Sequence, residues 1–122
     1  MDGYIDTYGH PYFKVKVFGV SEKLAKEFDA LLDTGFSGFL SLPLSAAIPL
    51  GLILRGTANF ELADGSIEET ITCIGFIRIN GEMKRGLISI SKGMDILLGI
   101  EFLRIFGKKL TIDIKNNIIK FE

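Results

Sequence analysis

The sequence contains no tryptophan, only one cysteine (Cys73) and only one histidine (His10). A single cysteine cannot form a disulfide within the chain. One cysteine and one histidine are also too few for the zinc sites that proteins build from these residues. The sequence therefore predicts no disulfide and no metal centre, and we expect no cofactor. Sparse cysteine is typical of proteins from a reducing compartment, so a cytoplasmic location is expected.

Long apolar runs and excess charge of one sign are missing as well. No apolar stretch reaches the ~20 residues that a helix needs to span a bilayer, and residues 1–13 lack the basic and apolar regions of a secretory signal. Acidic and basic residues are interspersed, with a formal net charge of −1. We therefore expect neither nucleic acid nor a membrane as a partner.

Glycine and apolar residues are abundant: 14 of the 122 residues are glycine and 48% are hydrophobic. This composition is typical of a folded, turn-rich protein, and the length suffices for one domain with a modest core. No linker, internal repeat or low-complexity segment interrupts the chain. We therefore expect residues 1–122 to form one domain, in which residues 1–11 are a loose N-terminal arm and His10 is exposed to solvent.

Most of the chain has the pattern of β-strands. Residues 12–17 alternate lysines with apolar residues, as a half-buried strand does. An Asp-Gly pair at residues 64–65 and an Asn-Gly pair at residues 80–81 predict tight hairpin turns, in which both central positions have positive φ. The predicted strands and hairpins are residues 12–17, 27–32, 57–72, 74–90, 96–98 and 110–121.

Two short helices are expected among these strands. Pro43 and Ser45 can open a brief helix that Pro49 ends. Residues 99–106 have the spacing of a helix, which Gly107 terminates, with Ile100, Leu103 and Phe106 on a shared face. Many short strands and one or two short helices indicate an all-β fold, either a barrel or a sandwich.

The most informative stretch runs from Phe28 to Pro43, where an apolar strand ends in Asp33-Thr34-Gly35. Taken alone, these three residues are also common in turns. Ser37 lies in Gly-Phe-Ser-Gly, but the nucleophile elbow Gly-x-Ser-x-Gly fails because Phe39 occupies its last position. The segments that follow in the chain decide between these interpretations.

Four features follow one another in a specific order: the strand ending in Asp33-Thr34-Gly35, a hairpin with its tip at residues 63–66, the apolar pair and glycine that open the helix at residues 97–103, and a closing hairpin at residues 110–121. In this order the chain resembles the single-domain, retropepsin-like aspartic proteases, of the cellular and prokaryotic type. The resemblance implies a closed acid-protease β-barrel with a flap hairpin.

The resemblance also implies a chemistry that needs two carboxylates. Two carboxylates at close range share one proton, and together they activate a water that attacks a peptide bond. The chain holds one complete motif: Asp2 and Asp64 precede glycines but follow no apolar strand, and Asp95 and Asp113 lack the following glycine. The second carboxylate must therefore be Asp33 of another copy, across the two-fold axis of a homodimer.

Roles for the remaining residues come from the resemblance as well. Thr34 would lock the two active-site loops together, and Gly35 would let the backbone turn and bring its N–H to the Asp33 carboxylate. Retroviral members carry an acid where this chain has Ser37, and they interleave their terminal strands, whereas residues 110–122 predict a complete hairpin. The dimer interface is therefore expected to be different and weaker. The residues expected to bind substrate are Phe36, Ser37 and Gly38 beside the motif, and Ala63, Asp64, Gly65 and Ser66 in the flap.

The function implied is an aspartic endopeptidase that acts as a homodimer on peptide or protein substrates. The alternative is a catalytically silent module that keeps the protease fold for dimerisation or peptide binding, because a fold does not fix a function. An intact Asp-Thr-Gly disfavours this alternative, since a silent copy has no need to keep it.

Overall fold

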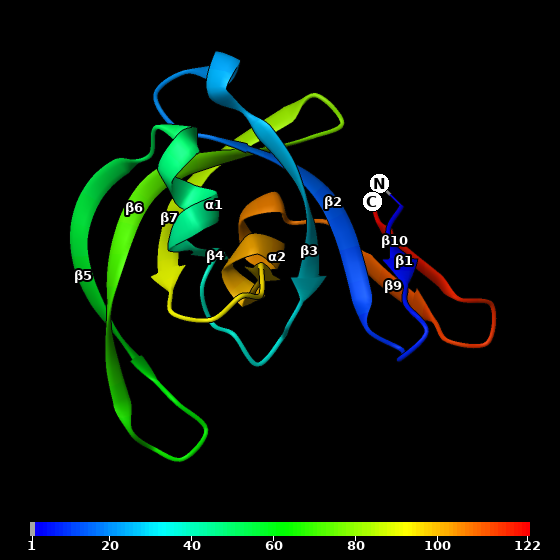
Figure 1. Cartoon of the computed structure of the whole chain (residues 1–122). Coiled ribbons are helices and arrows are strands. Elements are labelled where there is room, and N and C mark those ends of the chain that lie inside the picture. Colours follow the sequence, from blue (N-terminus) through cyan, green and yellow to red (C-terminus); the bar gives the residue numbers. More distant parts are fainter. Residues whose placement is uncertain (1) are drawn as a thin grey trace.

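The computed structural model describes residues 2–122 and is built mostly of β-strands (Figure 1). The strands are β1 (Tyr4–Ile5), β2 (Pro11–Phe18), β3 (Lys26–Leu32), β4 (Leu40–Pro43), β5 (Ile53–Glu61), β6 (Ile67–Ile79), β7 (Glu82–Ser91), β8 (Leu97–Leu98), β9 (Leu110–Asp113) and β10 (Ile118–Phe121). The helices are α1 (Leu44–Ala47), α2 (Ile100–Phe106) and two 3-10 turns, η1 (Glu22–Leu24) and η2 (Ile48–Leu50). No helix within residues 2–122 is long and apolar enough to cross a bilayer.

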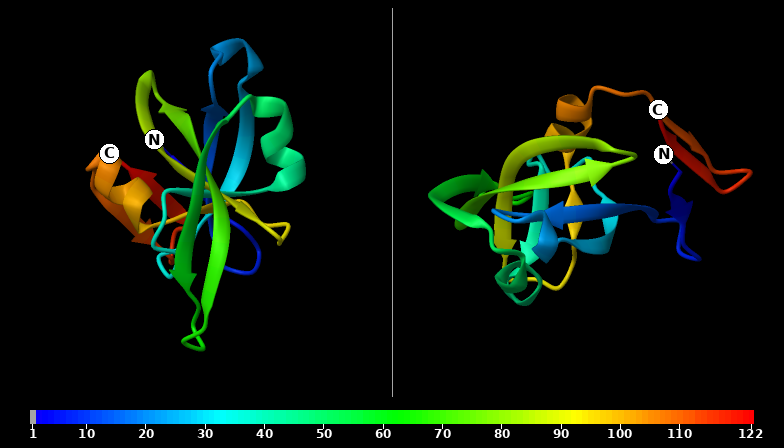
Figure 2. Two further views of the ribbon diagram at one scale, coloured as in Figure 1. Left: turned by 90° about the vertical axis from the view of Figure 1, so that its left-hand side faces the viewer. Right: turned by 90° about the horizontal axis from the view of Figure 1, so that it is seen from above.

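The main sheet closes on itself. Its strand order is β1-β2-β3-β8-β4-β7-β6-β5, and β2 pairs with β6 in addition to β3. Strands β2, β3, β8, β4, β7 and β6 therefore form a closed ring, which confirms the predicted all-β barrel (Figure 2). Strands β9 and β10 pair with each other in a separate two-stranded sheet, as the complete C-terminal hairpin predicted.

The core fills the ring with apolar side chains from alternate positions. Phe13, Val15 and Val17 of β2 are buried while Lys14 is exposed, so the alternation predicted the inward face correctly. Helix α2 covers one end of the core, and Gly107 ends it in the left-handed conformation (φ 60°), as predicted.

The buried face of α2 agrees in part with the predicted one, since Phe106 is buried and Leu103 packs against the core. Phe102 and Phe106, four residues apart, are buried, whereas Ile100 is 36% exposed. The ring of Phe102 packs against Phe39 and against Phe121 of β10, with ring centroids 6.3 and 5.4 Å apart. The bulkiest side chains of the helix thus occupy its inward face and displace Ile100 to the rim.

The two predicted tight turns have different outcomes. At Asn80 and Gly81 both φ values are positive (48° and 79°), as the hairpin between β6 and β7 requires. At the end of the β5–β6 hairpin only Gly65 has a positive φ (84°), and five residues, 62–66, connect the strands. The predicted hairpin is confirmed, but the expected positive φ at Asp64 is wrong: its carboxylate accepts a hydrogen bond from the Ser66 N–H (2.9 Å), which stabilises a wider turn.

The N-terminal segment is not the loose arm that the sequence suggested. Strand β1 pairs with the start of β2, and the Gly3 N–H donates to the carbonyl of Ile119 at 3.0 Å. Asp2 also forms a β-bridge with Lys120. The two ends of the chain therefore lie side by side (Figure 1). His10 is exposed, as expected.

Candidate active site

Asp33 lies where β3 leaves the barrel. The last two residues of β3, Leu31 and Leu32, pair in parallel with Leu97 and Leu98 of β8, and the Asp33 N–H donates to the carbonyl of Leu98 at 2.9 Å. Leu32 and Leu98 are buried. A central strand of the barrel therefore places the carboxylate at the edge of the core.

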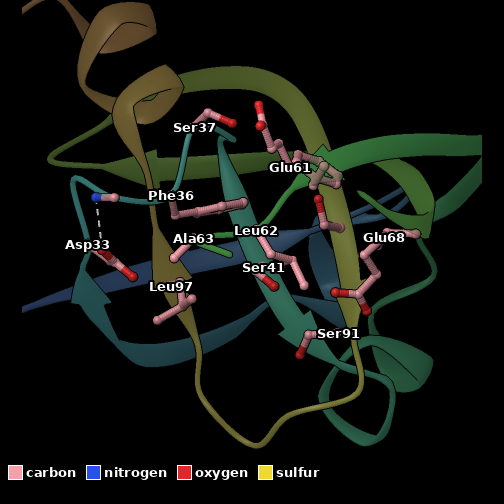
Figure 3. A pocket seen from close by; sticks show the side chains of 14 residues that line it. Asp33, Phe36, Ser37, Ser41, Glu61, Leu62, Ala63, Glu68, Ser91 and Leu97 are labelled. Atoms are coloured by element: carbon pink, nitrogen blue, oxygen red, sulfur yellow. Dashed lines mark hydrogen bonds between the residues drawn. The ribbon is translucent and has the colours of Figure 1, made fainter. Parts of the chain in front are cut away.

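The turn after Asp33 orients its carboxylate. The Gly35 N–H donates to Asp33 Oδ1 at 2.9 Å, and the Phe36 N–H donates to the Asp33 carbonyl at 3.1 Å (Figure 3). A Cβ atom at residue 35 would lie 3.1 Å from Oδ1, tighter than most Cβ contacts. Glycine at this position thus allows the close approach that the sequence predicted. The carboxylate is half-buried and opens to solvent on one side.

Helix α2 holds the rest of this loop. The N–H groups of Ile100 and Glu101 donate to the carbonyls of Phe36 and Gly38 at 2.9 and 3.1 Å. A Cβ atom at Gly99 would collide with both of these carbonyl oxygens. The loop from Asp33 to Gly38 is therefore fixed at both ends by backbone hydrogen bonds to the segment of β8 and α2.

A cleft of about 290 Å³ opens beside Asp33. One wall is the Asp33 loop, and the other is the end of the β5–β6 hairpin (Figure 3). The rings of Phe36 and Phe60 contact each other across it, with centroids 6.1 Å apart. The lining residues are Asp33, Gly35, Phe36, Ser37, Ser41, Phe60, Glu61, Leu62, Ala63, Glu68, Thr70, Ser89, Ser91 and Leu97.

The cleft brings together half of the residues predicted from the sequence: Asp33, Gly35, Phe36, Ser37 and Ala63.

The other half lies outside the cleft wall. Thr34 is exposed, and its hydroxyl has no hydrogen-bond partner among residues 2–122. Gly38 lines a neighbouring hollow on the far side of Phe60. Asp64, Gly65 and Ser66 are exposed at the hairpin end.

Several lining residues were missed by the sequence analysis. Ser41 of β4 and Ser89 of β7 are each only 5% exposed and sit opposite one another in the parallel pairing of these strands. Glu68 and Thr70 of β6 share one face of their strand, so the alternation of that strand could have identified them. The serines could not be found this way, because their meeting depends on which strands become neighbours.

Charge in the cleft is of one sign. Asp33, Glu61 and Glu68 line it, and no lysine, arginine or histidine of residues 2–122 does. No group of three or more histidine, cysteine, aspartate or glutamate side chains in the described part of the chain is placed to hold a metal ion. At the hairpin end, hydrogen bonds from the Ser66 hydroxyl and N–H lower the pKa of Asp64 below its ordinary value.

Comparison with known proteins gives a match in structure only. No family model matches the chain, and no curated protein does. Among solved structures, EIAV protease in complex with the inhibitor HBY-793 superimposes with a TM-score of 0.67 over 87% of this chain and 96% of that one, at 18% sequence identity. At this identity the likeness establishes the fold, which is that of a retroviral protease. The cellular and prokaryotic type suggested by the sequence stays a prediction.

Proposed function

We propose that the chain is an aspartic endopeptidase that hydrolyses peptide bonds with a water activated by two Asp33 carboxylates, one from each subunit of a homodimer. The observation that carries this proposal is the setting of Asp33. A core strand of a protease-like barrel presents this carboxylate to a cleft, and the Gly35 N–H fixes its orientation. If Asp33 only formed a turn, its carboxylate would not need to face a cleft or to follow a core strand of such a barrel.

The reaction follows from two carboxylates at close range. Like charges there cannot both ionise, so one Asp33 stays ionised and the other keeps a proton. The ionised carboxylate takes a proton from the water as its oxygen attacks the carbonyl carbon. The protonated carboxylate donates a hydrogen bond to the carbonyl oxygen and then helps protonate the leaving amine as the C–N bond breaks. Because the pair acts with one shared proton, we expect a bell-shaped pH dependence of activity.

The second carboxylate has to come from another chain. The other acids of the cleft, Glu61 and Glu68, stand on the opposite wall, on the hairpin strands (Figure 3). Thr34, Gly35 and Ser37 are exposed beside Asp33, so their surface is open to a partner. A two-fold axis through this surface places the same residue twice about one point. Within such a dimer the Thr34 hydroxyl would find the partner that it lacks in one chain.

The β5–β6 hairpin is the proposed flap. Its end projects from the same side of the barrel as the loop after β3 (Figure 1), and Ala63 near this end lines the cleft. Closing this hairpin over a peptide would exclude water other than the nucleophile. Phe36 and Ser37 would contact the substrate on the opposite side, with Gly38, Asp64, Gly65 and Ser66 reaching it on closure.

The dimer interface is proposed to differ from interleaved terminal strands. Both terminal segments already pair within the chain: β10 bonds with β9 along one edge, and the Ile119 carbonyl on its other side accepts from Gly3. An interface made mainly by the Asp33 loops and the flaps is smaller than one that adds an intermolecular sheet. We therefore expect a weak, reversible dimer of a single-domain protein.

Cleavage of an unfolded protein tests the proposal. We expect the wild-type chain to cleave casein and to be inhibited by pepstatin, while Asp33→Asn loses about 10²- to 10⁴-fold of this activity and keeps its circular dichroism spectrum. Asp29→Asn, the same change at an exposed position of β3 outside the cleft, is the matched control and should retain most activity. Equal activity in Asp33→Asn and the wild type would overturn the proposal and favour the silent module.

A further inference from the structure

The part of the cleft wall that β6 forms is polar, whereas Phe36, Phe60 and Leu97 elsewhere in the lining are apolar. Along the outer part of β6, Glu68 and Thr70 face the cleft, while Ile67 and Ile71 point to solvent and are 71% and 51% exposed. A strand with one face toward a protein interior normally places its apolar residues there. Here the arrangement is reversed: the apolar residues of this stretch lie on the outer face, and the face toward the cleft carries a carboxylate and a hydroxyl.

The base of the cleft is polar as well. Ser41 and Ser89 are each only 5% exposed, and both line the cleft. Neither hydroxyl has a hydrogen-bond partner among residues 2–122, and the Ser41 side chain points into the space between the walls (Figure 3). No fully buried side-chain oxygen or nitrogen of residues 2–122 lacks a partner, so both hydroxyls reach the open cleft, where each can donate a hydrogen bond to a ligand or accept one from it.

The carboxylates are also without cations. None of the ion pairs formed by residues 2–122 involves Glu61 or Glu68. Glu68 is half-buried, and a carboxylate that is partly removed from water is stabilised by a nearby positive charge. Lys92 lines an adjoining hollow that shares Glu68 and Ser91 with the cleft, but it forms no ion pair with Glu68. The missing cation can come from a bound peptide.

We infer that the cleft selects peptides with a lysine or arginine next to the scissile bond, and that Glu68 binds this side chain. The inference rests on the proposed function, because the scissile bond is placed next to Asp33 only if Asp33 is catalytic. One hollow contains both Asp33 and Glu68, so the basic residue lies close to the bond that is cut. The hydroxyl oxygens of Ser41 and Ser89 accept hydrogen bonds from the remaining N–H groups of the ammonium or guanidinium group. An acidic side chain is repelled from the same place.

Binding to the inactive Asp33→Asn chain tests this inference without requiring cleavage. A mixture of random peptides cleaved by the wild type, with products identified by mass spectrometry, first defines a peptide frame. Two fluorescent peptides that differ only in lysine or methionine at one position are then titrated by anisotropy. If the wild type cleaves nothing, every position of a fixed polyalanine-based frame is scanned with the same pair.

We expect the lysine peptide to bind about tenfold more tightly than the methionine peptide, and Glu68→Gln to remove most of this preference, as when one partner of a partly desolvated charge pair is lost. Glu69→Gln is the matched control: it removes the same charge from the next residue of β6, which does not line the cleft. Glu68→Lys should reverse the preference toward glutamate. Methionine binding as well as lysine at every position, or equal effects of the two glutamine variants, would overturn the inference.

The outcomes separate this inference from the proposed function. Cleavage that depends on Asp33 but shows no preference for basic residues overturns the inference alone. A lysine preference that depends on Glu68 in a chain that cleaves no peptide supports the charge selection and overturns the endopeptidase.

Discussion

The two walls of the cleft are built in opposite ways. The wall that carries Asp33 is tied to the core by backbone hydrogen bonds: the Leu98 carbonyl accepts one from it, and the N–H groups of Ile100 and Glu101 donate two to it. Buried strands lie directly behind this wall. The end of the β5–β6 hairpin, residues 62–66, is held by bonds within itself, from Leu62 to Ser66 and from Gly65 to Leu62, and all five of its residues are exposed. One wall fixes a carboxylate against the core, whereas the other ends in an exposed turn whose backbone hydrogen bonds stay within the turn.

This difference matches what the proposed reaction needs. A catalytic carboxylate has to keep its position to within fractions of an ångström, whereas a cover over the substrate has to move for binding and release. Local stability within one protein ranges from near zero in exposed turns up to the global value in core strands. The comparison therefore predicts that the same kind of change has a large effect on the Asp33 wall and a small effect on the hairpin.

Glycine-to-alanine changes on the two walls give the largest contrast. Gly99→Ala places a Cβ against the carbonyl oxygens of Gly38 and Phe36, so we expect a loss of about 3 kcal/mol in the free energy of unfolding. Gly65→Ala meets no atom within 4 Å, and only its positive φ opposes the change, at about 1 kcal/mol. Urea denaturation of both variants measures the difference. Equal losses in the free energy of unfolding would contradict the expected difference between the two walls.

A change at Thr34 sharpens the comparison through the dimer. The exposed hydroxyl of Thr34 is proposed to bond across the two-fold axis, so Thr34→Val should raise the dimer dissociation constant about tenfold and leave the monomer's stability unchanged. Sedimentation over a range of concentrations measures this constant. Thr57→Val, the same change at an exposed position of β5, is the control and should leave the dimer dissociation constant unchanged. A dimer as strong in Thr34→Val as in the wild type would remove Thr34 from the interface.

The smallest effect is expected at the hairpin end. Hydrogen bonds from Ser66 lower the pKa of Asp64, so the ionised carboxylate stabilises the turn above the unfolded pKa, and this stabilisation is lost as the pH falls through the lower folded pKa. Ser66→Ala should raise the Asp64 pKa toward its ordinary value while keeping the bond from the backbone N–H. An NMR titration of the Asp64 side chain checks this. An unchanged titration would mean that the Ser66 hydroxyl does not bond Asp64 in solution.

Local patterns predicted the parts of the fold that local forces determine. The alternation in β2, the Asn80-Gly81 turn and the left-handed Gly107 after α2 each depend on a few consecutive residues, and each was confirmed. The strand leading to Asp33 was predicted on the same basis.

Features that depend on distant partners were missed. Strand β1 is two residues long, and its place is set by pairing with β2 and by contacts of Gly3 with β10, so no local pattern marks it. The serine base of the cleft exists only because β4 lies parallel to β7. The sequence of β6 does show the inward-facing Glu68 and Thr70, but only once the strand's inner face is known.

Mixing wild-type chains with Asp33→Asn chains tests the central claim most directly. Both proteins are unfolded, combined in varied proportions at constant total concentration and refolded together, and peptide cleavage is measured. If one active site takes Asp33 from each of two chains, activity follows the square of the wild-type fraction, and an excess of Asp33→Asn suppresses the wild type. Activity in direct proportion to the wild-type fraction would mean that each chain carries a complete site by itself, which contradicts the shared pair.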